Sequence, residues 1–111
     1  MSQYVPSSGD LVYFNFNSQS GHEQVGKRPT IVLSPKEFNS KTGFAWVCPI
    51  ASQKKEYPFE VELPDQTIIY GVILIDQLKS LDWQAGGIEY KERVPDDVVE
   101  KCLARVHTIL F

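Results

Sequence analysis

The stretch Arg28-Pro29-Thr30-Ile31-Val32-Leu33 indicates how the chain folds. Its last four residues form a continuous apolar run, which is typical of a strand at the centre of a sheet. Pro29 has no N–H group and biases the preceding residue toward an extended backbone, so Arg28 is expected at the entrance of this strand. The sequence therefore predicts a charged side chain at the mouth of a central strand.

Shorter segments with strand patterns lie on both sides of this run. The first covers residues 11–16, follows a turn at Gly9–Asp10, and places Val12, Phe14 and Phe16 on one face. Further strands are expected at residues 44–49, 59–63, 70–75 and, more weakly, 88–93, with short helical turns at 35–39 and 80–83. In the strand at 59–63, Glu60 and Glu62 are expected to face water.

The last segment of the chain has a helical period instead. Apolar residues recur at helical spacing at Val98, Val99, Cys102, Leu103, Val106, Ile109 and Leu110. Pro95 fits the first helical position, and Asp96 and Asp97 suit the positive end of the helix dipole. The sum predicts a mainly β (α+β) domain spanning residues 1–111, a small bent antiparallel sheet or partly closed barrel with a closing C-terminal helix.

Composition narrows the classes of function. The 111 residues are 42% hydrophobic and 23% charged, as in an ordinary soluble domain. The net charge of −3 and the pI of about 5.3 argue, taken alone, against a nucleic-acid partner. The cations cluster at Lys27–Arg28 and Lys54–Lys55, however, which allows a local cationic groove on an acidic body.

Targeting and metal signals are missing from the sequence. No basic region followed by an apolar stretch opens the chain, and no apolar run reaches the roughly 18 residues of a membrane span. Cys48 and Cys102 lie in apolar runs and are expected to be buried free thiols, without the Cys/His spacing of a zinc site. We therefore expect a cytoplasmic protein with no membrane association, metal or other cofactor.

The loop before the central strand carries the most chemistry. The string Gly21-His22-Glu23-Gln24-Val25-Gly26-Lys27-Arg28-Pro29 combines an imidazole, an acid, an amide and two cations. RNA breaks when its 2′-hydroxyl attacks the adjacent phosphorus, which requires a base, an acid for the leaving oxygen and a group that holds the extra negative charge. Glu23, His22 and Arg28 are able to fill these three roles without a metal.

A second polar loop follows the strand at residues 44–49. It offers Ser52, Gln53, Lys54 and Lys55, whose cations either follow an RNA backbone or are simply solvated. Tyr57, Trp83 and Phe38 are aromatic side chains that are able to stack on bases, although packing in a core or dimer interface is commoner for tryptophan.

Several ordered strings resemble one protein family. They are Gly9-Asp10-Leu11, Gly21-His22-Glu23-Gln24-x-Gly26-x-Arg28-Pro29, Val32-Leu33-Ser34, Asn39 with Lys41-Thr42-Gly43, Tyr57-Pro58-Phe59-Glu60-Val61 and Asp76-Gln77-x-Lys79-Ser80. Together these strings resemble the MazF/PemK toxins of type II toxin–antitoxin systems, also called mRNA interferases, and the match runs from Tyr4 to about Trp83.

The resemblance implies a fold, an activity and partners. The fold is an SH3-like barrel of the CcdB/PemK type, and two copies form a homodimer whose grooves bind RNA. The activity is cleavage of single-stranded RNA within a short sequence, leaving a 2′,3′-cyclic phosphate and a 5′-hydroxyl. The partner is a MazE-like antitoxin whose disordered, acidic C-terminal segment occupies the groove and folds on binding.

The resemblance also assigns residues. Arg28 takes the catalytic arginine, Glu23 and Gln24 take the preceding pair, and Gln77 takes an RNA contact. Ala51 stands where the family usually has a catalytic threonine, so the hydroxyl of Ser52 is the substitute we expect, unless activity is weakened. The expected catalytic set is Arg28, Glu23 and Ser52, and the expected RNA contacts are His22, Gln24, Lys27, Gln53, Lys54, Lys55, Tyr57 and Gln77.

Other interpretations stay open at this point. Arg28 also suits a structural ion pair with Glu23, which either acts as the base or only orients Arg28, and His22 also suits a plain loop residue. A toxin of the same fold that poisons a protein target, as CcdB poisons DNA gyrase, is one alternative function. A binding module with little catalysis is another, because Ala51 has no hydroxyl.

Overall fold

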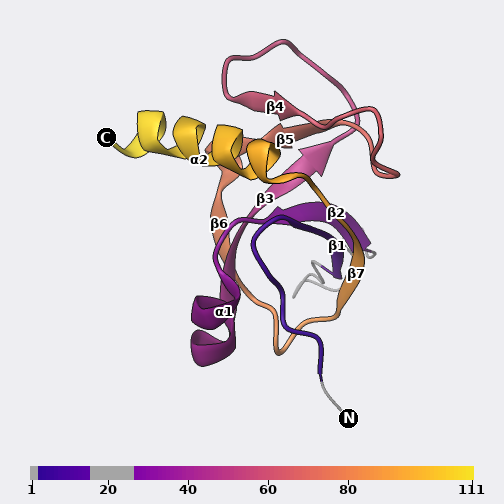
Figure 1. The fold of residues 1–111 in the computed structure, drawn as a ribbon, viewed down its shortest axis with the longest axis vertical. Helices are drawn as coiled ribbons and strands as arrows, with labels where there is room; N and C mark the ends of the chain where they lie inside the picture. The colour runs from indigo at the N-terminus through magenta and orange to yellow at the C-terminus, as the bar shows by residue number, and fades with distance from the viewer. Residues whose placement is uncertain (1–2, 16–26) are drawn as a thin grey trace, which may run out of the picture.

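A bent antiparallel sheet crossed by one long helix makes up the computed structural model, which describes residues 3–15 and 27–111 (Figure 1). The elements in chain order are β1 (Asp10–Asn15), β2 (Lys27–Val32), α1 (Lys36–Thr42), β3 (Phe44–Ala51), β4 (Glu60–Glu62), β5 (Val72–Leu74), the 3-10 helix η1 (Ile75–Gln77), β6 (Lys79–Asp82), β7 (Ile88–Arg93) and α2 (Asp96–Leu110). The expectations for the loop at residues 17–26, and for Phe16, fall outside the described residues.

Strand β3 organises the sheet because it pairs with three other strands. Its first half, from Phe44 to Val47, pairs with β6, and its end at Ile50 and Ala51 pairs with β5. On the other edge β3 pairs with β2, and the order runs β4-β5-β3-β2-β1-β7 with β6 also on β3. Because β3 pairs with β6 over its first half and with β5 at its end, the sheet bends along this strand. The end of β3 lies beside the start of β2.

Two apolar clusters lie on opposite faces of the central strands. Leu11 and Ile31 belong to the first cluster, in which Val98 and Cys102 of α2 close over the sheet. Val12 and Val32 point the other way, into a second cluster that contains Trp83. The neighbouring pairs Leu11–Val12 and Ile31–Val32 thus each divide between two cores, which explains why the sequence is continuously apolar at these positions.

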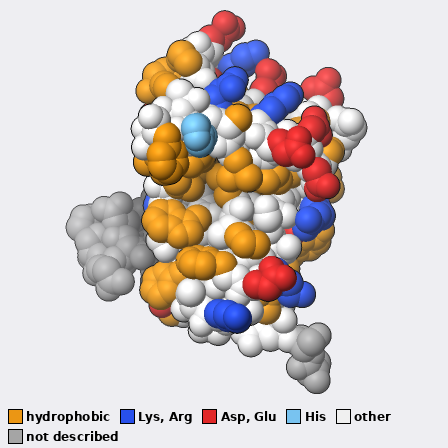
Figure 2. Space-filling view, turned by 60° about the vertical axis from the view of Figure 1, so that its left-hand side comes forward, with side chains coloured by type: hydrophobic (Ala, Val, Ile, Leu, Met, Phe, Trp, Pro, Cys, Tyr) orange, Lys and Arg blue, Asp and Glu red, His pale blue; other side chains and the backbone are white. Residues whose placement is uncertain are grey.

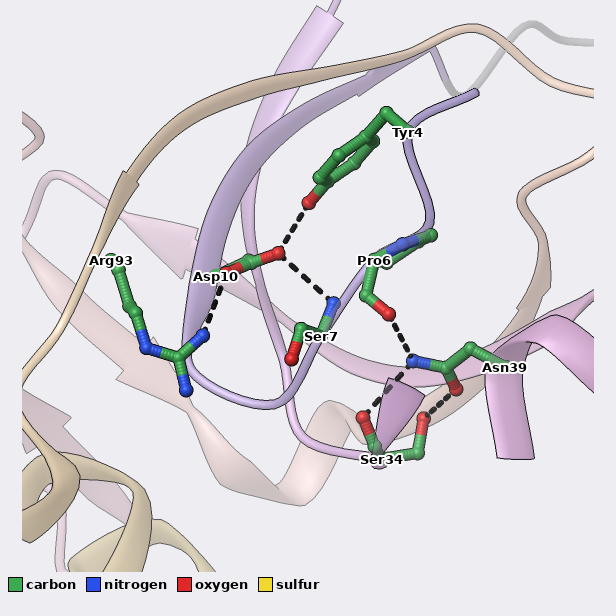
Figure 3. Close-up of polar contacts among 7 residues, drawn as sticks. All are labelled: Tyr4, Pro6, Ser7, Asp10, Ser34, Asn39 and Arg93. Carbon is green, nitrogen blue, oxygen red and sulfur yellow. Dashed lines mark hydrogen bonds and ion pairs between the residues drawn. The ribbon is translucent and has the colours of Figure 1, made fainter. Parts of the chain in front are cut away.

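A buried polar network ties the N-terminal segment to the sheet (Figure 3). The Asp10 carboxylate, 3% exposed, accepts hydrogen bonds from the Tyr4 hydroxyl, from Ser7 N at 2.9 Å and from Arg93 Nη1 at 3.2 Å. Asn39, fully buried, donates from Nδ2 to the Pro6 carbonyl at 2.8 Å. Asp10 and Asn39 therefore tie the N-terminal segment to the rest of the fold.

The predicted fold class is confirmed: the described residues form a mostly β, barrel-like antiparallel sheet with one C-terminal helix. Both cysteines are free and buried, as expected, and burial raises the pKa of each thiol to about 12. Within the described residues, no helix has the length and apolar character needed to cross a membrane.

Some local predictions were wrong. The helical turn expected at residues 80–83 is strand β6, because its pairing with Phe44–Val47 of β3 overrides a polar local sequence. The strand expected at 70–75 keeps only Val72–Leu74, since Ile75 begins η1. Pro95 is the N-cap of α2 and not its first helical residue. The turn at 35–39 extends to a helix ending at Thr42, where Gly43 adopts a φ of 76°.

Candidate active site

A cavity of about 760 Å³ opens where β2 begins and β3 ends. The loop after β3, strand β4 and the β5–η1 segment complete its wall. Its lining residues are Arg28, Pro29, Ile50, Ala51, Ser52, Gln53, Lys55, Tyr57, Glu60, Leu74, Asp76 and Gln77. Six of the eleven residues expected from the sequence as catalytic or RNA-binding therefore share one cavity: Arg28, Ser52, Gln53, Lys55, Tyr57 and Gln77.

Arg28 is exposed on β2, where its carbonyl accepts the Thr30 hydroxyl at 3.1 Å. Thr30 pairs with Pro49 of β3, so Arg28 and Ala51 face one another two residues further along these antiparallel strands. In the part of the chain that the structure describes, the guanidinium of Arg28 has no ion-pair partner. A guanidinium carries five N–H donors, which suit an anion in the cavity.

Ala51 lies at the crowded end of β3. It pairs with Val72, and a Cβ atom on Gly71 would lie 2.2 Å from the Ala51 carbonyl oxygen. Gly71 also has a φ of 134°, so this position favours glycine and the backbones of the two strands approach closely. Ser52, which follows directly and carries a hydroxyl, is exposed and lines the cavity.

Glu60 shapes the loop that follows β3. Its carboxylate accepts the backbone N–H of Lys55 at 3.2 Å and that of Tyr57 at 3.4 Å. Between them Glu56 has a φ of 57°, a left-handed conformation that costs free energy for a residue other than glycine. At the far end Arg105 of α2 donates from Nε to the Pro58 carbonyl at 3.0 Å. The loop that carries Lys55 and Tyr57 is therefore held at both ends.

Asp76 and Gln77 enter the cavity from η1. Ile75, 1% exposed, anchors this turn and donates its N–H to the Phe59 carbonyl at 3.0 Å. The negative charge of Asp76, together with a hydrogen bond to its carboxylate, raises the pKa of Tyr57.

The structure places some of the expected residues outside the cavity and brings in one that was expected to face water. Lys27 and Lys54 do not line the cavity but form exposed ion pairs, with Glu89 at 2.9 Å and Glu62 at 3.1 Å. Glu60 was expected to face water, but it is half-buried and lines the cavity. Trp83 is only 3% exposed and donates to the Asn39 carbonyl, so it offers no surface for a base.

Other expected residues are not placed, and some contributors were missed. His22, Glu23 and Gln24 fall outside the described residues. Sequence reasoning overlooked Asp76 and Leu74 as cavity residues, although the Asp-Gln string was a usable signal for Asp76. Among the described residues, no three His, Cys, Asp or Glu side chains gather as a metal site would require.

Comparison with known proteins extends this picture. Residues 7–110 match the family model described as PemK-like, MazF-like toxin of type II toxin–antitoxin system. The Escherichia coli K12 endoribonuclease toxin MazF is 41% identical over 110 residues, covering 99% of this chain and 98% of the relative. Escherichia coli endoribonuclease PemK is 33% identical over 106 residues, covering 92% and 80%.

Solved structures agree with the sequence relatives. A crystal structure of MazE–MazF from Deinococcus radiodurans matches with a TM-score of 0.92 at 44% identity, covering 97% of both chains. MazF alone from the same organism matches with a TM-score of 0.86, also at 44% identity, covering 97% of this chain and 98% of that one.

The fold and the cavity lined by Arg28 and Lys55 are thus those of a small β domain of the toxin type matched above. The sequence comparisons identify the family. The chain belongs to the PemK-like, MazF-like toxin family of type II toxin–antitoxin systems, and the relatives named above are endoribonucleases. The alternative of a CcdB-like toxin directed at gyrase receives no support from these comparisons.

Proposed function

We propose that this protein is the toxin of a type II pair and cleaves single-stranded RNA within a short sequence, without a metal ion. The observation that carries the proposal is the placement of Arg28. Its guanidinium is exposed at a cavity, faces the end of β3, and has no ion-pair partner among the described residues. A planar fork of donors in this position suits a phosphate that gains negative charge as it is attacked.

The remaining roles follow from the chemistry of the reaction. The 2′-hydroxyl attacks the adjacent phosphorus, Glu23 takes its proton or orients Arg28, and the 5′-oxygen leaves with a proton. Ser52, on the loop beside Ala51, supplies a hydroxyl to a phosphate oxygen or to the leaving group. The products are a 2′,3′-cyclic phosphate and a 5′-hydroxyl.

RNA contacts extend from this centre along the cavity. Lys55 and Gln53 lie beside Ser52 and suit the neighbouring phosphates, while Tyr57, 46% exposed, offers a ring on which a base stacks. Gln77 offers an amide to a base edge. His22, Gln24, Lys27 and Lys54 are further proposed RNA contacts, the lysines contacting RNA only when their exposed ion pairs open.

The proposed partners are an antitoxin and a second copy of the chain. Solved relatives include MazE–MazF complexes, and an acidic antitoxin segment would mimic phosphates at Arg28 and Lys55. Hydrophobic side chains gather over the face shown in Figure 2, and α2 with its C-cap exposes Leu103, Ile109, Leu110 and Phe111. A surface of this kind suits a homodimer, and we place the protein in the cytoplasm.

A cleavage assay in EDTA tests the proposal. Purified protein is incubated with a defined single-stranded RNA, beside Arg28→Ala and a matched control, Lys41→Ala, which removes an exposed cation of α1. We expect the wild type and Lys41→Ala to cut equally and Arg28→Ala to lose at least about a hundredfold in rate. Intact RNA with wild-type protein, or undiminished cutting by Arg28→Ala, contradicts the proposal.

The alanine at position 51 favours a second candidate function, which has less support than RNA cleavage. Without a threonine hydroxyl at this position, the protein would bind RNA and antitoxin with little catalysis. The same assay separates the two, because a binding protein retains the RNA on a gel without producing fragments.

A further inference from the structure

The β3–β4 loop, residues 52–59, ends in a turn whose three consecutive backbone carbonyls accept hydrogen bonds from three different elements. The Tyr57 carbonyl accepts the first N–H of β4 at 3.0 Å, and the Phe59 carbonyl accepts the first N–H of η1 at 3.0 Å. Between them, the Pro58 carbonyl accepts a hydrogen bond from Nε of Arg105 in α2 at 3.0 Å. The turn is therefore fixed from three sides, and only the middle contact comes from a side chain.

Arg105 gives the contact between α2 and this turn a defined direction. α2 contacts β4 and η1, two of the elements that form the wall of the cavity (Figure 1). Its buried side chains, Val98 and Cys102, pack into the apolar core, and apolar contact is not directional. Among the described residues, no other side chain of α2 forms a hydrogen bond or ion pair with another element. Arg105 thus provides the polar link between the closing helix and the loop.

Apolar packing holds little of the β3–β4 loop itself. Residues 52–58 are all exposed, including Lys55 and Tyr57, which line the cavity. Its backbone is fixed by Glu60, which accepts the N–H groups of Lys55 and Tyr57, and by the three carbonyl contacts of the turn. Because an exposed segment with few hydrogen bonds opens at a low cost in free energy, the loss of one of them should be felt along the loop.

We propose that Arg105 is a positioning residue for RNA binding: its hydrogen bond to the Pro58 carbonyl keeps the β3–β4 loop where it lines the cavity. Lys55 and Tyr57, the loop residues proposed to contact RNA, are thereby held in place before RNA arrives. Arg105 does not line the cavity, so it acts on RNA through the loop. The inference rests on the proposed function and extends it, because it gives α2 a part in the affinity for RNA.

The donor atom and the charge of Arg105 are separable by substitution. Glutamine carries an N–H donor at the same position along its side chain as Nε of arginine, and it has no charge. Lysine keeps the charge but has a methylene group at that position. Arg105→Gln should therefore preserve the contact with Pro58, whereas Arg105→Lys should lose it. If Arg105 only attracted RNA phosphates by its charge, the order of the two variants would be reversed.

Two measurements on each variant test the inference. Kd is measured by fluorescence anisotropy with a non-cleavable RNA, which carries 2′-deoxyribose at the mapped cleavage site. Amide hydrogen exchange, measured without RNA, reports how often the N–H groups of Lys55 and Tyr57 open. The variants are Arg105→Gln, Arg105→Lys, Arg105→Ala and, as a matched control, Lys101→Ala, which removes an exposed cation one turn earlier on α2.

The expected result is a parallel change in loop opening and in affinity. In Arg105→Ala and Arg105→Lys, the exchange rates of the two amides and Kd should each rise about fivefold, as for the loss of one hydrogen bond. Arg105→Gln and Lys101→Ala should resemble the wild type in both measurements. The single-turnover cleavage rate at saturating RNA should change by less than about twofold in all variants, because Arg28 lies on β2 and not on the loop.

Three outcomes would overturn the inference. The first is wild-type affinity in Arg105→Ala. The second is affinity that follows charge, with Arg105→Lys intact and Arg105→Gln weakened while amide exchange is unchanged. The third is faster exchange by the same factor throughout the chain, which would show that Arg105 stabilises the whole fold and does not position the loop.

The same samples distinguish this inference from the proposed function. If the wild type binds and cuts RNA while the Arg105 variants bind it equally well, only the role of Arg105 fails. If amide exchange changes as expected but the wild type binds no single-stranded RNA, the proposed function fails. The role of Arg105 in affinity then fails with it, and only its link to the loop stands.

Discussion

The backbone nitrogen of Lys55 lies 3.2 Å from Oε1 of Glu60 and 3.3 Å from its Oε2, so a residue of β4 holds the loop that brings Lys55 to the cavity. The same Oε1 accepts the N–H of Tyr57 at 3.4 Å. This one carboxylate spans the left-handed residue Glu56 and compensates for its strained backbone. An acid in the wall of the cavity thus serves to hold a loop in place.

Removing this clamp tests its importance for binding. Glu60→Ala is expected to weaken RNA binding about tenfold and to lower the free energy of unfolding by about 1 kcal/mol, because two backbone donors lose their acceptor. Glu60→Gln keeps an acceptor oxygen and is expected to retain most of the affinity. Anisotropy with the non-cleavable RNA and thermal melting provide the two measurements.

Glu62→Ala is the matched control, since Glu62 lies two residues away in β4 and its carboxylate forms an exposed ion pair with Lys54. Exposed pairs of this kind contribute about 0–1 kcal/mol, so stability and binding should hardly change. Equal effects of the Glu60 and Glu62 substitutions would disprove the clamp.

A hydroxyl at position 51 is expected to accelerate cleavage. Ala51→Thr places an Oγ1 atom in the cavity opposite Arg28, and one oriented donor contributes about 10²–10³ in rate. We expect a rise of at least about tenfold in the single-turnover rate with little change in Kd. Ala51→Val, with the same shape and no hydroxyl, serves as the control.

Ser52→Ala measured in both backgrounds completes this test. If Ser52 now supplies the missing hydroxyl, its removal lowers the rate in the natural chain and matters less in the Ala51→Thr background. A natural rate that is unaffected by Ser52→Ala removes Ser52 from the catalytic set.

Asp10 is expected to dominate the stability of the N-terminal segment. Its buried carboxylate accepts hydrogen bonds from Tyr4, Ser7 and Arg93. Asp10→Ala leaves these donors without that acceptor and should lower the free energy of unfolding by about 2–3 kcal/mol. Arg93→Gln, which alters a half-exposed partner, should cost less than about 1 kcal/mol. Urea unfolding measures both, and equal losses would contradict the central place of Asp10.

Tyr4 is expected to make the fold sensitive to alkali. Burial, followed by the hydrogen bond to Asp10 and its charge, raises the pKa of Tyr4 well above the usual value of 10.0. A raised pKa means that the stabilisation is complete below about pH 10 and declines as the unfolded chain ionises above it. Allowing for partial exposure of the ring, the decline is up to about 1 kcal/mol per pH unit.

Tyr4→Phe removes this titration, so its loss of stability between about pH 10 and pH 11 should be smaller than that of the wild type. The buried cysteines titrate in the same range and are common to both proteins, so the difference between the two isolates Tyr4. Parallel stability curves would show that Tyr4 ionises as freely in the folded state as in the unfolded one.

Sequence reasoning predicted the fold class and much of the cavity for identifiable reasons. The apolar run at 30–33, the period of α2 and the position of Arg28 before Pro29 are local signals, and each was placed correctly. Strand β6 was missed because its pairing with β3, which lies much earlier in the chain, is not encoded in its own polar sequence. Tertiary pairing decides such segments.

Charges were harder to place than strands. Lys54 and Lys55 are neighbours with the same side chain, yet Lys54 pairs with Glu62 while Lys55 lines the cavity. Asp10 and Asn39 lie in motifs of the toxin family, yet both are buried in structural hydrogen bonds and not in the cavity. A motif shows that a residue matters, and only its contacts show whether it serves the fold or the reaction.

The central claim, that Arg28 assists attack by the 2′-hydroxyl of RNA, is tested most directly by the ends of the cut RNA. Fragments produced in EDTA should carry a 2′,3′-cyclic phosphate and a 5′-hydroxyl, and a single 2′-deoxyribose at the cut site should abolish cleavage. Arg28→Ala should produce the same ends at least about a hundredfold more slowly. Fragments with a 3′-hydroxyl and a 5′-phosphate, or cutting at the deoxyribose, would contradict this account.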